Sequence, residues 1–282
     1  MSFTSWLQDC HTLATREHAR RSPVKPRALR PRLEALEGRV VLSTLTVTNT
    51  LDSGHGSLRY EIAHANKNTT IVFDPRLDGQ TITLTSGELD ITTSLRINGP
   101  GAGQLTISGG ENSRVFDVNA SAPVVLSGLT ISNGAAFGPS TPLYQYDGGG
   151  ILNLSTLTLS GCDVSGNTDS GPGIAYGCGI YNAGTLTLSG CSVSNNYAGT
   201  GFEAALTEGG GIYNAGTLTV TNSTFSGNHV NLDGGGIFNA GTLTVSNSIF
   251  SGNFVFDSFS GVVRYTSNIA GPYTDLGGNS FS

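Results

Sequence analysis

Short apolar runs alternate with small polar residues through the second half of the chain. The pattern is clearest in GGGIYNAGTLTVTNSTFSGN, which begins at Gly209. Ile212, Leu218, Val220 and Phe225 share one parity, and the other positions are mostly Thr and Ser. A period of two over such short runs, broken by Ala-Gly, Thr-Asn and Ser-Gly, predicts three short strands joined by tight bends.

This 20-residue pattern occurs four times, beginning at Gly148, Gly177, Gly209 and Gly234. The starts lie 29, 32 and 25 residues apart, and all the variation in length follows the final Asn of each copy. A constant core with variable spacers is typical of a solenoid, because each coil completes its strand pairing and its core only by stacking on its neighbours. We therefore predict an all-β fold, a right-handed parallel β-helix.

Stacking the copies places equivalent residues in ladders. The predicted structural ladders are Ile151, Ile180, Ile212, Ile237 and Asn153, Asn182, Asn214, Asn239. The opposite parity predicts an outward stripe of Leu152, Tyr181, Tyr213 and Phe238. Gly184, Gly216 and Gly241 fall at a bend where we expect a positive φ.

The glycine-rich start followed by F-x-x-N resembles the repeat of the polymorphic outer membrane proteins, secreted β-helical surface proteins with a pectin-lyase-like fold. The F-x-x-N half is present at Phe225–Asn228 and Phe250–Asn253, and the first two copies have Val in place of Phe. The resemblance covers residues 148–253 only. It implies a passenger-like surface solenoid.

The segment 44–75 is predicted to form the N-terminal cap of the solenoid. Residues 56–66 have the pattern of a short helix, with Ser57 as its N-cap and Leu58 and Ile62 on one face. The segment resembles the CSLREA-type stretch that precedes many bacterial β-helices, with Gly56 where that family usually has Cys. A helix across the first coil would cover its open core and strand edges. Arg59 and Glu61 are expected to form a surface or intra-cap ion pair.

The rest of the chain divides around this solenoid. Residues 1–43 are predicted to be a basic, Pro-containing, disordered tail. Within the tail, residues 30–43 resemble an N-terminal segment of predicted extracellular planctomycete proteins, which implies export or sorting. Residues 76–147 are predicted to form irregular coils, 148–253 regular coils, and 254–282 a degenerate final coil.

Charge and composition exclude several functions. Residues 44–282 hold sixteen Asp and Glu against six Lys and Arg, which argues against sequence-independent nucleic-acid binding. We predict no transmembrane segment, and either a monomer or end-to-end association through the C-terminal coil. A fragment of a longer surface protein is a further alternative.

Cys162 and Cys191 hold the same place in successive copies, which favours an interior ladder, with a disulfide as the alternative.

No catalytic, cofactor-binding or metal-binding residue is predicted, and no cofactor is implied. The leading interpretation is a non-catalytic, exported protein of the cell surface or outer envelope with a structural or adhesive role. Its partner would be a cell-wall or extracellular glycan, or another surface protein. The alternative is a polysaccharide-active lyase or glycoside hydrolase, which carboxylates gathered on one face of residues 71–145 would favour. The proposed loop contacts are Tyr144, Tyr146, Tyr176, Tyr197 and Phe202.

Overall fold

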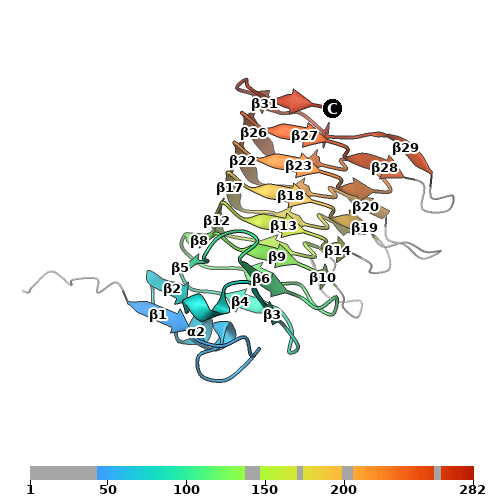
Figure 1. The fold of residues 1–282 in the computed structure, drawn as a ribbon. Helices are drawn as coiled ribbons and strands as arrows, with labels where there is room; N and C mark the ends of the chain where they lie inside the picture. The colour runs from blue at the N-terminus through green and yellow to red at the C-terminus, as the bar shows by residue number, and fades with distance from the viewer. Residues whose placement is uncertain (1–42, 137–146, 170–173, 199–205, 257–261) are drawn as a thin grey trace, which may run out of the picture. The chain divides into compact units, whose positions relative to one another are not determined.

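A computed structural model describes residues 43–282, except 137–146, 170–173, 199–205 and 257–261. The tail predicted over residues 1–43 therefore lies outside the described residues, apart from Ser43. The described chain folds as a parallel β-solenoid whose strands stack coil upon coil (Figure 1). The prediction of an all-β parallel solenoid with one short helix is confirmed.

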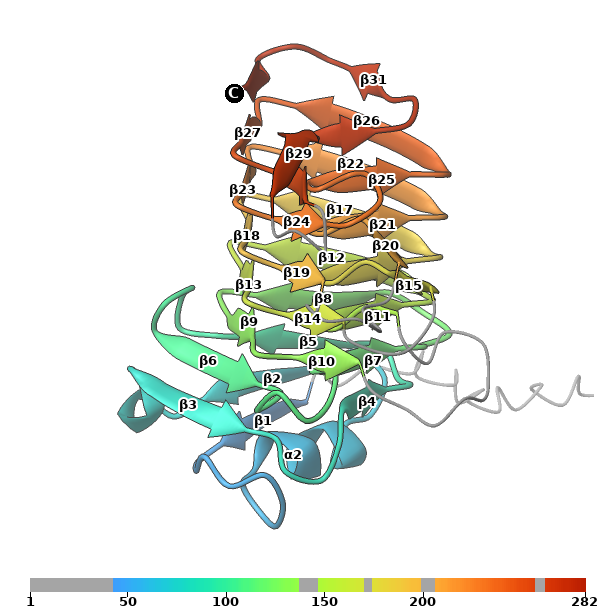
Figure 2. The ribbon, with the colours of Figure 1, turned by 90° about the vertical axis from the view of Figure 1, so that its right-hand side faces the viewer.

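Three long parallel sheets form the walls of the solenoid (Figures 1 and 2). The nine-stranded sheet contains, in spatial order, β1 (Thr44–Val47), β2 (Thr69–Phe73), β5 (Leu95–Asn98), β8 (Val124–Ser127), β12 (Thr156–Ser160), β17 (Thr185–Ser189), β22 (Thr217–Thr221), β26 (Thr242–Ser246) and β31 (Thr274–Asp275). The eight-stranded sheet contains β3 (Gln80–Thr83), β6 (Leu105–Ser108), β9 (Thr130–Ser132), β13 (Asp163–Ser165), β18 (Ser192–Ser194), β23 (Thr224–Ser226), β27 (Ile249–Ser251) and β32 (Ser280–Phe281). The seven-stranded sheet contains β4 (Leu89–Ile91), β7 (Phe116–Val118), β11 (Ile151–Asn153), β16 (Ile180–Asn182), β21 (Ile212–Asn214), β25 (Ile237–Asn239) and β30 (Ile269–Ala270).

Two smaller sheets lie between the eight-stranded and seven-stranded walls along the chain. The six-stranded sheet contains β10 (Ala135–Ala136), β14 (Thr168–Asp169), β19 (Tyr197–Ala198), β24 (His229–Val230), β28 (Phe254–Phe256) and β29 (Val263–Thr266). A two-stranded sheet pairs β15 (Ile174–Tyr176) with β20 (Leu206–Glu208). All the pairings between described strands are parallel except that of β28 with β29, which is antiparallel.

Inward apolar residues stack in register to form one continuous core. Leu157, Leu186, Leu218 and Leu243 pair in order along the nine-stranded sheet, and all four are buried. Phe225 and Phe250, the aromatic residues of the two F-x-x-N motifs, are fully buried with ring centroids 4.8 Å apart and planes 9° apart. The strand pairing thus continues through the core as side-chain stacking, which one coil alone cannot provide.

Helix α2 (Leu58–His64) forms where the sequence predicts it. Ser57 adopts extended backbone and its hydroxyl accepts a hydrogen bond from the Tyr60 N–H at 3.2 Å. Leu58 and Ile62 are buried in the core cluster, and the helix packs against β1 and β4. A short 3-10 helix, η1 (Pro75–Leu77), follows β2.

The positive φ expected at Gly184, Gly216 and Gly241 is wrong, because none of these three glycines adopts it. Glycine is needed there for a different reason. A Cβ atom on Gly216 would lie 2.0 Å from the carbonyl oxygen of Gly184 in the neighbouring coil. The first glycine of each glycine-rich start does adopt positive φ, for example Gly209 with φ +74°. Glycine is therefore needed at these three positions because neighbouring coils approach closely, and not because the backbone is left-handed.

Cys162 and Cys191 are free and buried in the core cluster. In the next two coils their place is taken by serines, and the N–H of Cys191 donates to the Ser223 hydroxyl oxygen at 3.1 Å. Burial raises the pKa of the Cys162 thiol to about 11. The described arrangement thus agrees with an interior ladder in which serines replace the cysteines in later coils.

Candidate binding face

The outward residues of the seven-stranded sheet form one ladder that runs the length of the wall. Strand register aligns successive members one coil apart, and Figure 2 shows β7, β11, β21 and β25 stacked in this order. We call this set the outer ladder. Its members are Asp90, Asp117, Leu152, Tyr181, Tyr213, Phe238 and Ala270.

One half of the outer ladder is aromatic. The rings of Tyr181 and Tyr213 lie 5.5 Å apart with planes 4° apart, and those of Tyr213 and Phe238 lie 5.2 Å apart with planes 6° apart. The ring of Tyr176, on β15, lies 4.5 Å from that of Tyr213. Tyr213, Phe238 and Tyr176 are partly exposed. Nearly parallel rings with centroids this close lie face against face, so they form a rigid stack, which we call the aromatic platform, and each ring covers part of its neighbour's face.

The outward stripe expected from the sequence is only partly exposed. Leu152 and Tyr181 are buried, with 4% and 7% of their surface exposed. The ring of Tyr176 lies 6.4 Å from that of Tyr181. Alternation along a strand specifies which side a residue faces, but segments beyond the strand decide whether solvent reaches it.

A second ladder flanks the platform at the turn before each glycine-rich start. It consists of Asp147, Tyr176, Glu208 and Asp233, and we call it the turn ladder. Backbone hydrogen bonds set its register, because the N–H groups of Gly148, Gly177 and Gly209 donate to the carbonyl oxygens of Tyr176, Glu208 and Asp233. Three of its four members are carboxylates: Asp147 is buried, and Glu208 and Asp233 are partly exposed.

Burial and neighbouring carboxylates raise the pKa of residues in both ladders. Burial raises the pKa of Tyr213, and the carboxylates of Glu208 and Asp147 raise it further. Burial also raises the pKa of Glu208, with Asp233 adding to the effect. Burial raises the pKa of Asp147 to about 6, against the opposing effects of the Tyr176 N–H and Arg114.

Carboxylates occupy the other end of the outer ladder. One oxygen atom from each of Glu88, Asp90 and Asp117 lies within 4.8 Å of the others, a spacing that a divalent cation could bridge. Arg114 is buried and donates from Nη1 to the Glu88 carboxylate at 2.7 Å. Burial raises the pKa of Asp117 to about 6, while Arg114 opposes the rise and Glu88 and Asp90 add to it. The sequence does not show this cluster, because Asp117 comes from the coil after that of Glu88 and Asp90.

A network of hydrogen bonds joins the cap to this acidic end. Arg59 pairs with Asp52 at 2.8 Å, in place of the expected pair with Glu61, and donates to the carbonyl oxygens of Gly87 and Glu88 at 2.6 Å each. Asp52 also accepts hydrogen bonds from the backbone N–H groups of Thr85 and Ser86. Burial alone would raise the pKa of Asp52, but its hydrogen-bond donors outweigh burial and lower the pKa to about 2.

The ladder residues predicted from the sequence all lie in register in adjacent coils. The four isoleucines are fully buried, and the asparagines are buried and joined by side-chain hydrogen bonds. Asn153 donates to Asn182 at 2.7 Å, Asn182 to Asn214 at 2.7 Å, and Asn214 to Asn239 at 2.6 Å. These residues support the solenoid and contribute no exposed functional group.

The proposed loop contacts have different environments. Tyr176 belongs to the platform described above. The ring of Tyr197 stacks on that of His229 at 5.6 Å, and His229 stacks on Phe254 at 4.8 Å, along the six-stranded sheet. Burial lowers the pKa of His229. Tyr144, Tyr146 and Phe202 lie outside the described residues.

A second asparagine ladder lies at the end of the repeat, where the sequence analysis noted Asn only as the last residue of each motif. Nδ2 of Asn167 donates to Asn196, Asn196 to Asn228, and Asn228 to Asn253, at 2.9, 2.9 and 2.8 Å. Asn253 then donates to Asn268 at 2.9 Å, which carries the ladder into the final coil. The Asn of F-x-x-N is therefore a structural residue, as its Phe is.

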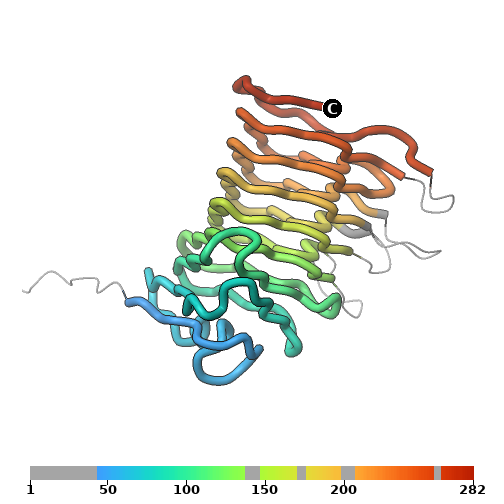
Figure 3. Tube along the Cα trace, viewed as in Figure 1, coloured from blue at the N-terminus to red at the C-terminus, as the bar shows by residue number. Residues whose placement is uncertain are grey.

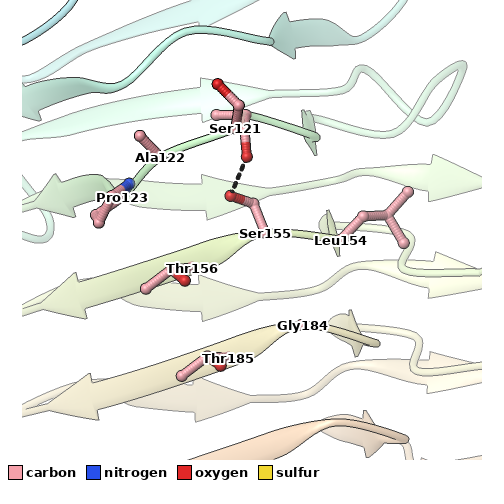
Figure 4. A pocket seen from close by; sticks show the side chains of 9 residues that line it. Ser121, Ala122, Pro123, Leu154, Ser155, Thr156, Gly184 and Thr185 are labelled. Carbon is pink, nitrogen blue, oxygen red and sulfur yellow. Dashed lines mark hydrogen bonds between the residues drawn. The ribbon is translucent and has the colours of Figure 1, made fainter.

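Figure 4 shows a shallow hollow at the bend between the seven-stranded and nine-stranded sheets. It is lined by small or neutral side chains, among them Ser121, Pro123, Ser155 and Thr185. The Ser155 hydroxyl donates to the Ala120 carbonyl oxygen at 2.6 Å. None of the residues lining the hollow is titratable, so we place the candidate site on the outer ladder instead.

Comparison with known proteins agrees with this architecture. A family described as the right-handed beta helix region matches residues 94–271, which is more than half of the chain. The chain belongs to this family, which includes both enzymes and non-enzymes. The search of curated proteins gives no match. Among the described residues, no helix has the length and hydropathy needed to cross a membrane.

Proposed function

We propose that this chain is a non-catalytic β-helix protein of the cell surface or outer envelope, with a structural and adhesive role. It holds an extended glycan along the outer ladder. The observation that supports this function is the aromatic platform, where Tyr213 and Phe238 are stacked, parallel and partly exposed, with Tyr176 beside them.

A glycan suits this platform for physical reasons. The faces of pyranose rings are apolar, and the exposed parts of the stacked aromatic rings provide an apolar line beside them. The rings are fixed by strand pairing and by contact with their neighbours, so little side-chain freedom is lost when a ligand binds. The export segment suggested by residues 30–43 agrees with a location where cell-wall or extracellular glycans are present.

The binding is tested by electrophoresis of the native protein through gels that contain a neutral, an acidic or an amino-sugar polysaccharide. At least one polysaccharide should retard the wild-type chain. Tyr213→Ala should lower the affinity about two- to tenfold, since a ring contact contributes about 0.5–1.5 kcal/mol. Thr219→Ala, which changes an outward residue of the nine-stranded sheet, serves as the matched control. A wild-type chain that none of the polysaccharides retards would contradict the proposal.

The location is tested separately, by surface protease shaving combined with mass spectrometry of the terminal peptides. We expect accessible solenoid peptides at the cell surface and a mature N-terminus near Ser43. An intact chain recovered only from the cytosol would refute the surface assignment.

A polysaccharide-active enzyme is the second candidate, because three carboxylates and Arg114 gather on the face formed by β4 and β7. Asp117, with a pKa of about 6, would be the proton-transferring group. An assay for new reducing ends or unsaturated products on a polysaccharide panel distinguishes the candidates. Activity that Asp117→Asn removes, and that Asp78→Asn retains, would favour the enzyme.

A further inference from the structure

The outward residues of the nine-stranded sheet are nearly uniform in the regular coils, where β12, β17, β22 and β26 stack one above another (Figure 1). Strand pairing aligns two ladders that consist of threonine alone. Both ladders are exposed or partly exposed, and together we call them the threonine array. The first ladder is Thr156, Thr185, Thr217, Thr242, and the second is Thr158, Thr187, Thr219, Thr244.

The preference of threonine for strands does not by itself explain this uniformity. Val, Ile and Tyr prefer strands as well, yet none of them occurs in the array. The inward positions of the same strands do exchange residues, since Leu188 pairs with Val220. The first copy keeps Thr-x-Thr although Leu154 and Ser155 precede it where later copies have Ala-Gly. The hydroxyl and methyl groups of threonine are thus retained at positions whose neighbours vary.

The array is rigid and regularly spaced. Threonine has few side-chain rotamers because it is branched at Cβ. The buried amide ladder fixes the backbone below, since Asn182 donates to the Thr217 carbonyl oxygen at 3.1 Å. Coils repeat at a short distance, as the 4.8 Å between the ring centroids of Phe225 and Phe250 shows. Along each strand, residues on one side repeat at about 6.6 Å, which is twice the rise per residue.

The surface of an ice crystal repeats at nearly these two spacings. Water molecules held between such hydroxyl groups already lie close to crystal positions, so joining the crystal orders few additional molecules. Among the described residues, the Thr221 hydroxyl donates to the Leu188 carbonyl oxygen, whereas the hydroxyls of the array make no hydrogen bond to protein. The outward positions of β12, β17, β22 and β26 carry no charge. A charged group would orient water around itself and disturb an ice-like layer.

We propose that the threonine array binds the surface of ice. The hydroxyl groups hold a layer of water at crystal spacing, the methyl groups separate neighbouring water molecules, and this layer joins the growing crystal. The inference goes beyond the glycan-binding function and does not rest on it, because the array and the outer ladder belong to different sheets.

The test is the partition of the full chain between ice and liquid while ice grows slowly from a dilute solution. The wild-type chain should be enriched in the ice, whereas a protein that does not bind ice is rejected into the liquid. Thr187→Tyr should lower the fraction in ice several-fold, because a bulky ring within the array holds the crystal away from neighbouring hydroxyls. Ser194→Tyr makes a similar change at an outward position of the eight-stranded sheet, and it should partition as the wild type does.

The second ladder member tested is not the only one available. Thr217→Tyr, at an exposed position of the first ladder, should also lower the fraction in ice, and it decides the test if circular dichroism shows that Thr187→Tyr is unfolded. A wild-type chain rejected from ice would overturn the proposal, and so would folded array variants that partition as the wild type does. A chain that adsorbs to crystalline cellulose and is rejected from ice would overturn it too.

Failure of this inference is distinguishable from failure of the glycan-binding function. Tyr213→Ala should keep its enrichment in ice and lose retardation in polysaccharide gels, and Thr187→Tyr should do the reverse. Loss of both properties in either folded variant would refute two separate binding faces.

Discussion

The irregular coils, 76–147, and the regular coils, 148–253, satisfy their buried polar groups in different ways. In the irregular coils a few long charged side chains reach across coils, as Arg114 does to Glu88 and to the carbonyl oxygens of Asp147 and Gly148. In the regular coils, neutral amides bond to copies of themselves, as Asn182 does to Asn214. Figure 3 shows the same contrast in the backbone, with evenly stacked turns above and wider excursions near the cap.

The difference teaches how repetition changes the chemistry of a solenoid. An amide carries both a donor and an acceptor, so identical residues in successive coils can pair indefinitely. A charged group stacked on its own kind is repelled, and once buried it needs an opposite charge or several dipoles. The regular coils thus satisfy most of their buried polar positions with neutral amides, whereas the irregular coils bury an arginine beside carboxylates.

The largest expected effect comes from a substitution that disrupts the core of the regular coils. Phe225→Ala should lower the free energy of unfolding by about 4 kcal/mol, because a fully buried ring that stacks on Phe250 is lost and leaves a cavity. Urea unfolding measures the change. Ile249→Ala is the control, since Ile249 is 50% exposed and should change stability by less than about 0.5 kcal/mol. A loss below about 1 kcal/mol for Phe225→Ala would contradict the stacked core.

The next largest effect comes from a substitution that interrupts one amide ladder. Asn214→Ala should lower the free energy of unfolding by about 3 kcal/mol, because Asn214 donates to Asn239 and to the Thr242 carbonyl oxygen and accepts from Asn182. Asn119→Ala, at an exposed asparagine after β7, is the control. Hydrogen exchange should show the lost protection in the regular coils. Equal stability losses for the two variants would refute the ladder's role.

A smaller effect belongs to the cap and the irregular coils. Asp52→Asn should cost about 2 kcal/mol, because hydrogen bonds to a charged group are weakened at Arg59, Thr85 and Ser86. Hydrogen exchange should show the loss in residues 44–91 while the regular coils stay protected. Asp78→Asn serves again as the exposed control. Uniform loss along the chain would mean that the two regions unfold as one unit.

The smallest expected effect is the pH dependence of stability that Asp52 and Asp117 produce. Asp52 has a lowered pKa, so its contribution to stability is present above about pH 4 and is lost as pH falls toward 2. Asp117 has a raised pKa, so stability declines as pH rises from about 4 to about 6, by about 1 kcal/mol or less. Unfolding measured from pH 2 to 7 should show both slopes. Asp52→Asn should remove the first, Asp117→Asn the second, and a slope unchanged in its variant would contradict the assignment.

The regular coils could be predicted from the sequence because they repeat. Register followed from aligning the four copies, and the inward parity of Ile212, Leu218 and Val220 followed from a period of two. Helix α2 was predictable because its cap and apolar face are local signals. The positive φ assigned to Gly216 was wrong because the space there is limited by the coil below, which no local pattern records.

The candidate site was likewise predictable only where its residues repeat. The aromatic members of the outer ladder were visible as equivalent positions, but the burial of Tyr181 was not, since alternation along a strand does not show what covers its outer face. The carboxylate cluster was missed for the same reason. Glu88, Asp90 and Asp117 come from coils that share no repeat, so nothing in the sequence aligns them.

The sequence by itself determined the solenoid, its register from 148 to 253, the capping helix and the acidic balance of the body, because these follow from periodicity, local capping and composition. Only the tertiary structure decided which ladder residues reach solvent, which acids approach one another and where Arg59 and Arg114 find partners. Those outcomes depend on distances between coils that are far apart in the chain, and such distances become fixed only when the coils stack.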